Sequence, residues 1–225
     1  MGRLQALTTL LGAAVLATGC DIEGKATVTV TKARQEAVQA TGTAPTAPPA
    51  PTKETVAPVR APRKLCEGQL AKPGRDLPRQ NPSRMAAPGE RPPSASIPTG
   101  GGYTWINLWA AWCVPCKEEL PRLWSFASRL KQAGQTMNLV FVSLDDDERQ
   151  LETFLQAQPT GGLRSTYWLR EGHERDAWLS QVGIAKDPQL PVQLVVDRRG
   201  KVRCVIGGAV EEEDFAEVRA IVAAN

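Results

Sequence analysis

The sequence predicts an α/β sandwich that begins near residue 103, and three observations predict it. Two short apolar runs, at 105–110 and 138–144, are typical of strands that are buried on both faces. After each run, apolar residues recur every three or four positions, as they do on one face of a helix. Two more apolar runs, at 192–196 and 202–206, flank a turn sequence and predict an antiparallel hairpin.

Helices connect these runs. The first, over Glu118 to Leu130, places its apolar residues on one face. The acids at 145–147 can cap a second helix, and another helical stretch lies around 177–182. An amphipathic helix over 211–223, with acids in its first turn, closes the chain. Strand, helix, strand and helix followed by a hairpin and a helix give an α/β sandwich.

The first twenty residues predict a targeting signal. Arg3 supplies a positive charge, and the apolar stretch that follows is too short to span a bilayer. The stretch ends in Leu-Ala-Thr-Gly-Cys at 16–20, which resembles a bacterial lipobox, although Ala17 stands where such motifs most often have Leu. We therefore expect Cys20 to be lipidated, with a plain cleaved signal peptide as the alternative.

Residues 21–62 predict a spacer and residues 63–102 an irregular collar on the folded domain, which we place at 103–225. The spacer narrows to Ala, Pro, Thr and Val, a composition that favours extended polyproline II structure. Residues 1–102 hold 13 Lys and Arg against 7 Asp and Glu, while residues 103–225 hold 14 against 17. Because the basic residues are scattered in a Pro-rich segment, we expect no nucleic-acid binding.

The chemistry is carried by Cys113 and Cys116, which lie between the first buried strand and the first long helix. Cysteines three residues apart can close a small disulfide ring. At a helix N-terminus the unpaired amides and the macrodipole stabilise a thiolate, so Cys113 is the predicted attacking thiol. Cys116 is placed to resolve the mixed disulfide. Pro115 fits the first helical turn, which needs no amide donor there.

Three other interpretations of this pair stay open. A zinc site needs four ligands, and the rest of the core offers only Cys204 and the single histidine, His173. A purely structural bridge across two residues would constrain little of the unfolded chain. A copper carrier could present both thiolates to Cu(I) as soft ligands. We favour redox chemistry and expect no metal and no cofactor.

Four short segments resemble a known family. They are Asn-Leu-Trp-Ala-Ala-Trp-Cys-Val-Pro-Cys at 107–116, Glu-Leu-Pro at 119–121, Leu-Pro at 190–191 and Asp-Arg-Arg-Gly at 197–200. From about residue 103 to 224 the chain resembles the thioredoxin superfamily, and within it the membrane-anchored TlpA/ResA-like thiol–disulfide oxidoreductases. The resemblance implies a thioredoxin-like three-layer sandwich, in which helices flank a central mixed β-sheet.

The resemblance also implies roles for residues beside the cysteines. Pro191 is expected to follow a cis bond and to face the disulfide, with an ordinary trans proline in an edge strand as the alternative. Asn107 stands where thioredoxins carry a buried aspartate, so Glu119 is expected to assist proton transfer at Cys116; otherwise it is a solvated surface acid. Trp112 and Leu190 are expected to contact the substrate.

Cys66 and Cys204 remain, one in the collar and one in the last strand. An exported protein keeps such cysteines paired more often than free. We therefore expect a Cys66–Cys204 disulfide that ties the collar to the sheet edge. The alternative is a buried free thiol at Cys204 and an exposed one at Cys66.

Together these expectations describe an enzyme, a thiol–disulfide oxidoreductase of the bacterial cell envelope. We expect a lipid-anchored monomer that faces the periplasm, reduces disulfides in exported proteins and is recharged by a membrane electron donor. Maturation of cytochromes or metalloproteins is one use for such a reductase. A soluble periplasmic protein, a disulfide-donating oxidase and a non-catalytic module that binds Cu(I) or a partner are the alternatives.

Overall fold

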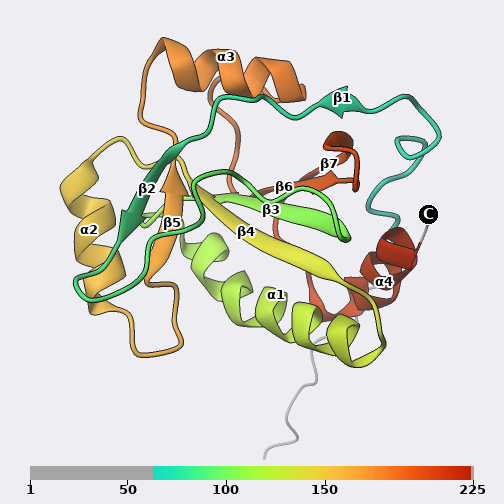
Figure 1. The fold of residues 1–225 in the computed structure, drawn as a ribbon, viewed down its shortest axis with the longest axis horizontal. Coiled ribbons are helices and arrows are strands. Elements are labelled where there is room, and N and C mark those ends of the chain that lie inside the picture. Colours follow the sequence, from blue (N-terminus) through green and yellow to red (C-terminus); the bar gives the residue numbers. More distant parts are fainter. Residues whose placement is uncertain (1–62, 224–225) are drawn as a thin grey trace, which may run out of the picture. The chain divides into compact units, whose positions relative to one another are not determined.

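The computed structural model describes residues 63–223. The expected signal at 1–20, with Cys20, and the expected spacer at 21–62 lie outside the described residues. The described part contains a seven-stranded mixed sheet with the order β1-β7-β6-β3-β4-β5-β2 (Figure 1). The predicted α/β sandwich with a mixed sheet is confirmed.

The centre of the sheet is β3 (Tyr103–Trp109), whose seven residues are all buried. It pairs in parallel with β4 (Met137–Ser143) and antiparallel with β6 (Val192–Val196). Beyond β6 lies β7 (Lys201–Gly207), which completes the predicted hairpin. Beyond β4 lies the short β5 (Ser165–Trp168), which the sequence did not predict.

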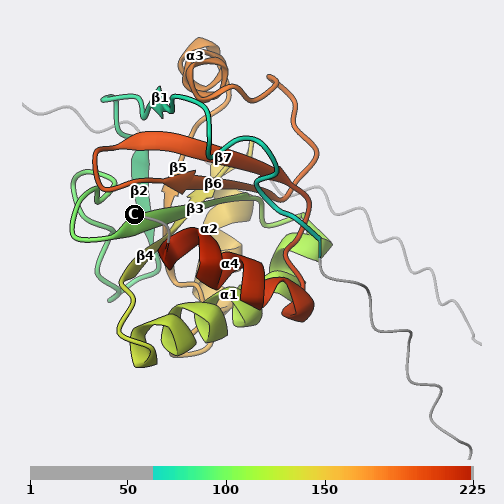
Figure 2. The ribbon, with the colours of Figure 1, turned by 90° about the vertical axis from the view of Figure 1, so that its right-hand side faces the viewer.

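Helices cover both faces of this sheet. Apolar residues of α1 (Val114–Gln132), α2 (Glu148–Ala157) and α4 (Phe215–Ala223) belong to one core cluster, and those of α3 (His173–Val182) belong to the other. A single 3₁₀ turn, Glu212–Asp214, leads into α4. Figure 2 shows α1 and α4 together on one side of the sheet and α3 on the opposite side. The result is a three-layer sandwich.

The segment 63–102 carries more regular structure than the predicted irregular collar. Its strand β1 (Arg75–Asp76) pairs with β7, and its strand β2 (Ser83–Ala86) pairs with β5, so it supplies both edges of the sheet. A composition rich in Pro and Gly argues against helices and central strands. It does not exclude short edge strands, where unpaired backbone groups and proline are tolerated.

The alternation of side chains along β3 separates the two cores. Trp105 and Trp109 lie in the cluster that contains α1, while Ile106 and Leu108 lie in the cluster that contains α3. Asn107 falls between the two tryptophans and shares their face, where it is fully buried. Between residues 63 and 223, no helix combines the length and the apolar character that a membrane span requires.

Candidate active site

The two cysteines lie where β3 passes into α1. Cys113 is the N-cap of the helix and has an extended backbone, and its Sγ accepts a hydrogen bond from the Cys116 amide at 3.2 Å. The two cysteines form a disulfide in which Cys113 is 3% exposed and Cys116 is 0% exposed. Pro115 occupies the first turn of the helix. An anionic sulfur at Cys113 would therefore meet the positive end of the helix dipole.

The loop before Cys113 is held by Asp145, a buried carboxylate at the end of β4. Both of its oxygens accept the Ala111 amide at 3.0 Å, and the Ser143 hydroxyl donates to Oδ2 at 2.7 Å. Burial raises the pKa of Asp145, against the effect of these bonds. The acids at 145–147 were predicted to cap the next helix, but only Asp147 does so, by accepting the Arg149 amide. Asp145 instead positions the cysteine loop, because its strand ends beside that loop.

Exposed apolar side chains flank the disulfide. Among the described residues, the large hydrophobic side chains that are exposed to solvent are Trp112, 54% exposed, and Val114, 57% exposed. Trp112 also lines a cavity of about 160 Å³, together with Leu190 from the loop before β6. The Leu190–Pro191 bond is cis, and Pro191 is buried. Trp112 and Leu190, the two residues expected to contact substrate, therefore border one hollow beside the cysteines.

Glu119 lies one turn after Cys116 on α1 and is 0% exposed. Its carboxylate accepts hydrogen bonds from Asn107 Nδ2 at 2.6 Å, from Gln193 Nε2 at 3.0 and 3.2 Å, and from the Val210 amide at 3.0 Å. Burial raises the pKa of Glu119 to about 6, although these donors and the charge of Arg122 act in the opposite direction. Such a carboxyl can gain or lose a proton near neutral pH.

This environment differs from that of a solvated surface acid, the alternative left open by the sequence. Its neighbour Glu118 is exposed, whereas Glu119 points into the core beneath the sheet. Sequence reasoning did not identify Gln193 as a partner of Glu119. The available signal was a single polar residue inside the apolar run of β6.

Residues 101–202 match the family model for thioredoxin-like proteins. The chain carries a thioredoxin-like domain. The domain is 24% identical over 117 residues to the thiol-disulfide oxidoreductase ResA of Geobacillus thermodenitrificans, a match that covers 52% of this chain and 61% of that protein. It is 37% identical over 65 residues to sporulation thiol-disulfide oxidoreductase A of Bacillus subtilis, covering 28% of this chain and 38% of the relative.

Neither match reaches two thirds of the relative's own length. Among solved structures, the thioredoxin-like domain is similar to a putative thiol:disulfide interchange protein DsbE from Chlorobium tepidum. The sequence identity is 21% and the TM-score is 0.49, and the match covers 68% of this chain and 99% of that one. The family model over residues 101–202 and the sequence relatives confirm the predicted resemblance to the thioredoxin superfamily.

A second disulfide joins Cys66 to Cys204. It joins β7 to the segment that precedes β1, across a sequence separation of 138 residues. The Gln69 side chain adds to this junction, because its Nε2 donates to the Val205 carbonyl at 3.0 Å and its Oε1 accepts the Val205 amide at 2.9 Å. Both cysteines are buried. The bridge thus fastens the N-terminal segment along β7.

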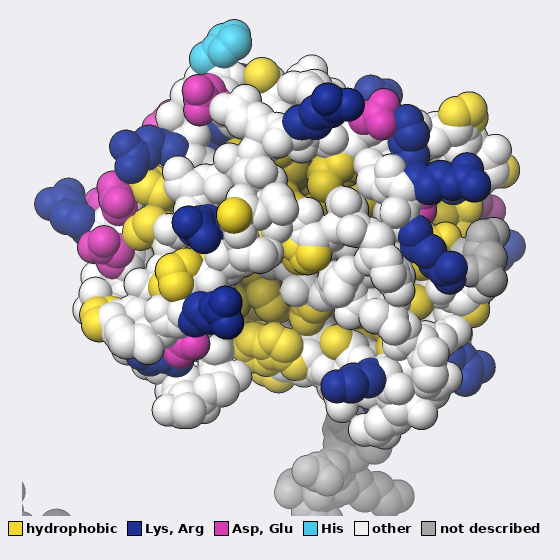
Figure 3. Space-filling view, in the orientation of Figure 1, with side chains coloured by type: hydrophobic (Ala, Val, Ile, Leu, Met, Phe, Trp, Pro, Cys, Tyr) yellow, Lys and Arg dark blue, Asp and Glu magenta, His cyan; other side chains and the backbone are white. Residues whose placement is uncertain are grey.

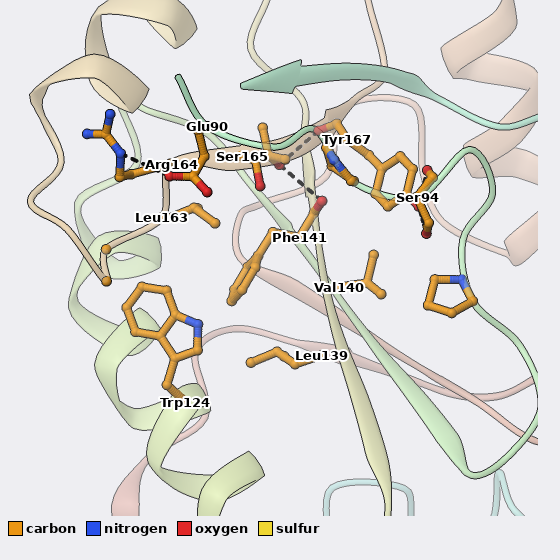
Figure 4. A pocket seen from close by; sticks show the side chains of 15 residues that line it. Glu90, Ser94, Trp124, Leu139, Val140, Phe141, Leu163, Arg164, Ser165 and Tyr167 are labelled. Atoms are coloured by element: carbon orange, nitrogen blue, oxygen red, sulfur yellow. Dashed lines mark hydrogen bonds and ion pairs between the residues drawn. The ribbon is translucent and has the colours of Figure 1, made fainter. Parts of the chain in front are cut away.

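A second hollow lies away from the cysteines. A cavity of about 430 Å³ opens between β4 and β5, lined by Trp124, Leu139 and Phe141, with the Arg164–Glu90 ion pair at one side (Figure 4). It shares no lining residue with the hollow that contains Trp112 and Leu190. This larger cavity is therefore separate from the redox pair.

On the face seen in Figure 3, Lys and Arg side chains are scattered among acidic and neutral ones. Within residues 63–223, no three or more His, Cys, Asp or Glu side chains are grouped so that they could hold a metal ion. His173 is the first residue of α3, and Cys204 is in the second disulfide.

Proposed function

We propose that this protein is a thiol–disulfide oxidoreductase that reduces disulfides in other proteins through Cys113 and Cys116. The observation that carries the proposal is the cysteine pair at the N-terminus of α1 with a fully buried carboxylate, Glu119, one turn further along the same helix. A purely structural bridge would have no use for an ionisable group of this kind. The similarity to proteins that are named thiol-disulfide oxidoreductases supports the same class of reaction.

The reaction begins from the dithiol. The Cys113 thiolate attacks one sulfur of a client disulfide, forms a mixed disulfide and releases the first client thiolate. Cys116 then attacks Cys113 Sγ, closes the Cys113–Cys116 disulfide and releases the second client thiolate. Two electrons pass to the client, and the Cys116 thiol must lose its proton. Glu119 accepts that proton, directly or through the network around it.

The client is bound by the apolar surface beside the pair. Trp112, Val114 and Leu190 present apolar area next to a disulfide whose sulfurs are almost fully covered. An extended client segment that lies across these side chains would bury them and bring its own sulfur to Cys113. The proposed clients are exported proteins with oxidised cysteines, including those that must be reduced before haem or a metal is attached.

The proposed location is the cell envelope. The expected signal at 1–20, lipidation at Cys20 and the spacer at 21–62 would hold the domain on the periplasmic side of a membrane. Each catalytic cycle leaves the pair oxidised, so two electrons and two protons must come from a donor. We propose a membrane-bound dithiol protein as that donor, since a lipid anchor keeps the domain within its reach.

Trapping the mixed disulfide tests this proposal. Reduced Cys116→Ser protein, incubated with a disulfide-containing protein such as insulin, is expected to accumulate a covalent adduct through Cys113 that a reducing agent releases. Reduced wild type is expected to cleave the insulin disulfides and to end as the Cys113–Cys116 disulfide. A Cys113→Ser variant that still reduces insulin at the rate of the wild type would overturn the assignment. Stoichiometric Cu(I) binding without exchange would favour the carrier.

A further inference from the structure

A polar group lies beneath the centre of the sheet, where the strands are otherwise apolar. The register of β3 and β6 pairs Asn107 directly with Gln193. Trp105 is two residues before Asn107 on β3, so its side chain is on the same face of the sheet. Trp105 is 1% exposed, and Asn107 and Gln193 are 0% exposed. Buried polar groups need hydrogen-bond partners, and these three side chains form hydrogen bonds with one another.

The indole of Trp105 determines which way the Gln193 amide faces. Trp105 Nε1 donates to Gln193 Oε1 at 2.9 Å, and Asn107 Nδ2 donates to the same oxygen at 3.0 Å. An indole N–H can donate but cannot accept. The Gln193 oxygen must therefore face Trp105, and this leaves its NH₂ group toward Glu119, at 3.0 and 3.2 Å from the two carboxylate oxygens.

Asn107 is oriented in the same sense. Its Nδ2 donates to Glu119 and to Gln193, while its Oδ1 is buried and has no hydrogen-bond partner among the described residues. A buried carbonyl without a partner costs free energy. Both amides thus turn their donors toward Glu119, and in the case of Asn107 this orientation leaves the carbonyl unsatisfied.

We propose that Trp105 and Gln193 are positioning residues of the redox site: the indole N–H fixes the Gln193 amide as a donor to Glu119, and the pair thereby stabilises the ionised carboxylate that receives the proton of Cys116. This inference deepens the proposed function and rests on it for the role of Glu119. Trp105 acts entirely through Gln193, since the structure gives it no hydrogen bond to the carboxylate itself.

The other charges around Glu119 are few. On α1, Arg122 lies one turn further on and favours the ionised carboxylate. The segment after β7 contributes the Val210 amide and Glu211, which is ion-paired with Arg122 at 3.1 Å. The strands β3 and β6 contain no Asp, Glu, Lys, Arg or His. On the side of Glu119 that faces the sheet, its ionisation therefore depends on the neutral amide donors of Asn107 and Gln193. The Trp105 indole determines how the Gln193 amide is oriented.

Trp105→Phe is the primary test, with Trp109→Phe as its matched control. Both substitutions remove a buried indole N–H from β3, but Trp109 Nε1 donates to Thr166 Oγ1 and not to Gln193. Without the Trp105 N–H, the Gln193 amide can turn its oxygen toward Glu119, which favours the protonated acid. The titration of Glu119 is followed by carbon-13 NMR of the side-chain carboxyl in the oxidised protein, and Glu119→Gln identifies its signal.

The Glu119 midpoint is expected to rise by about one pH unit in Trp105→Phe, the size of effect expected from one hydrogen bond to a charged group. It is expected to stay at the wild-type value in Trp109→Phe. Gln193→Met, which removes the donor and preserves the length of the side chain, is expected to shift it in the same direction. Unchanged midpoints in Trp105→Phe and Gln193→Met, or an equal shift in Trp109→Phe, would overturn the proposal.

A measurement on the wild type covers the case in which the variants do not fold. The Gln193 side-chain NH₂ and Trp105 indole N–H resonances are expected to titrate together with the Glu119 carboxyl, while the Trp109 indole resonance stays constant. If the Gln193 and Trp105 resonances do not titrate with the Glu119 carboxyl, Trp105 and Gln193 do not influence its ionisation and the proposal is wrong. These experiments keep the disulfide closed and need no reductase activity, so a failed insulin assay would overturn the proposed function separately.

Discussion

The two disulfides of the domain differ in the length of chain that they close, in their position in the fold and in the groups around them. Cys113–Cys116 spans three positions at a helix N-terminus, beside exposed apolar side chains and above a buried carboxylate. Cys66–Cys204 spans 138 positions and joins a segment to the edge of a sheet. The hydrogen bonds that Gln69 makes beside Cys66–Cys204 go to the backbone of Val205 and not to an acid.

This difference indicates how a redox disulfide can be separated from a structural one. A redox pair needs groups that matter only when it opens: helix dipoles for the thiolate, a proton acceptor and a surface for the client. A structural pair is defined by the length of chain that it closes. On these grounds we assign exchange to Cys113–Cys116 and stabilisation to Cys66–Cys204, and each assignment can be tested against the other.

The largest expected effect on stability follows from removing the long bridge. The Cys66→Ala, Cys204→Ala double variant is expected to lose about 2–5 kcal/mol of unfolding free energy, because its unfolded chain is no longer closed into a long loop. Urea unfolding of the oxidised proteins measures the loss. Insulin reduction at a temperature where the variant is folded is expected to remain at the wild-type rate. A variant that is as stable as the wild type, or that no longer reduces insulin, would contradict the assignment of stabilisation to Cys66–Cys204 and of disulfide exchange to Cys113–Cys116.

The next effect concerns Glu119 and depends on pH. Its pKa is about 6 in the folded protein against an ordinary value of 4.5, so the folded state holds the proton more tightly than the unfolded chain. The protonated Glu119 carboxyl therefore stabilises the folded state, and this stabilisation is fully present below pH 4.5 and is lost as the pH rises through 6. It amounts to about 2 kcal/mol, since one pKa unit corresponds to about 1.36 kcal/mol.

Glu119→Gln supplies the comparison for this effect. The difference in unfolding free energy between wild type and variant, both oxidised, is expected to change by about 2 kcal/mol from pH 4 to pH 7. Taking the difference cancels the contribution of Asp145, whose pKa is also raised. The variant is also expected to exchange disulfides more slowly, with a flattened pH profile. A constant difference across this range would mean that Glu119 titrates as an ordinary surface acid.

The smallest effect on the domain is expected from Cys20→Ala. If Cys20 carries the proposed lipid anchor, its loss changes the location of the protein and leaves both its exchange rate and its stability unchanged. Fractionation of cells into membrane and soluble parts measures the change. A variant that stays in the membrane fraction to the same extent as the wild type would contradict the proposed anchor.

The central elements of the fold could be predicted from the sequence because their apolar patterns are strong. The runs that became β3, β4 and the β6–β7 hairpin are buried, and α1 carries a clear apolar face. The strands β1, β2 and β5 could not be predicted. Each has two to four residues, and β1 and β2 are partly or fully exposed, so long-range pairing and not local pattern defines them.

The site was predictable to the same degree. The Cys-x-x-Cys spacing and its position before a helix predicted Cys113 and Cys116 as the redox pair, and the family resemblance predicted a role for Glu119. Gln193 and Asp145 could not be found in this way. Gln193 meets Glu119 only through the register of β3 with β6, and Asp145 meets Ala111 only because β4 ends beside β3. A single sequence contains no direct signal for such contacts.

The reduction potential of the Cys113–Cys116 pair tests the reductase assignment most directly. A strong oxidant needs a specially stabilised thiolate, but here Val114 and Pro115 bring no polar side chain to Cys113. We expect a potential near that of thioredoxin, about −270 mV. The measurement equilibrates the purified domain with glutathione buffers and quantifies the oxidised fraction. A value above about −180 mV, in the range of isomerases and oxidases, would contradict the assignment.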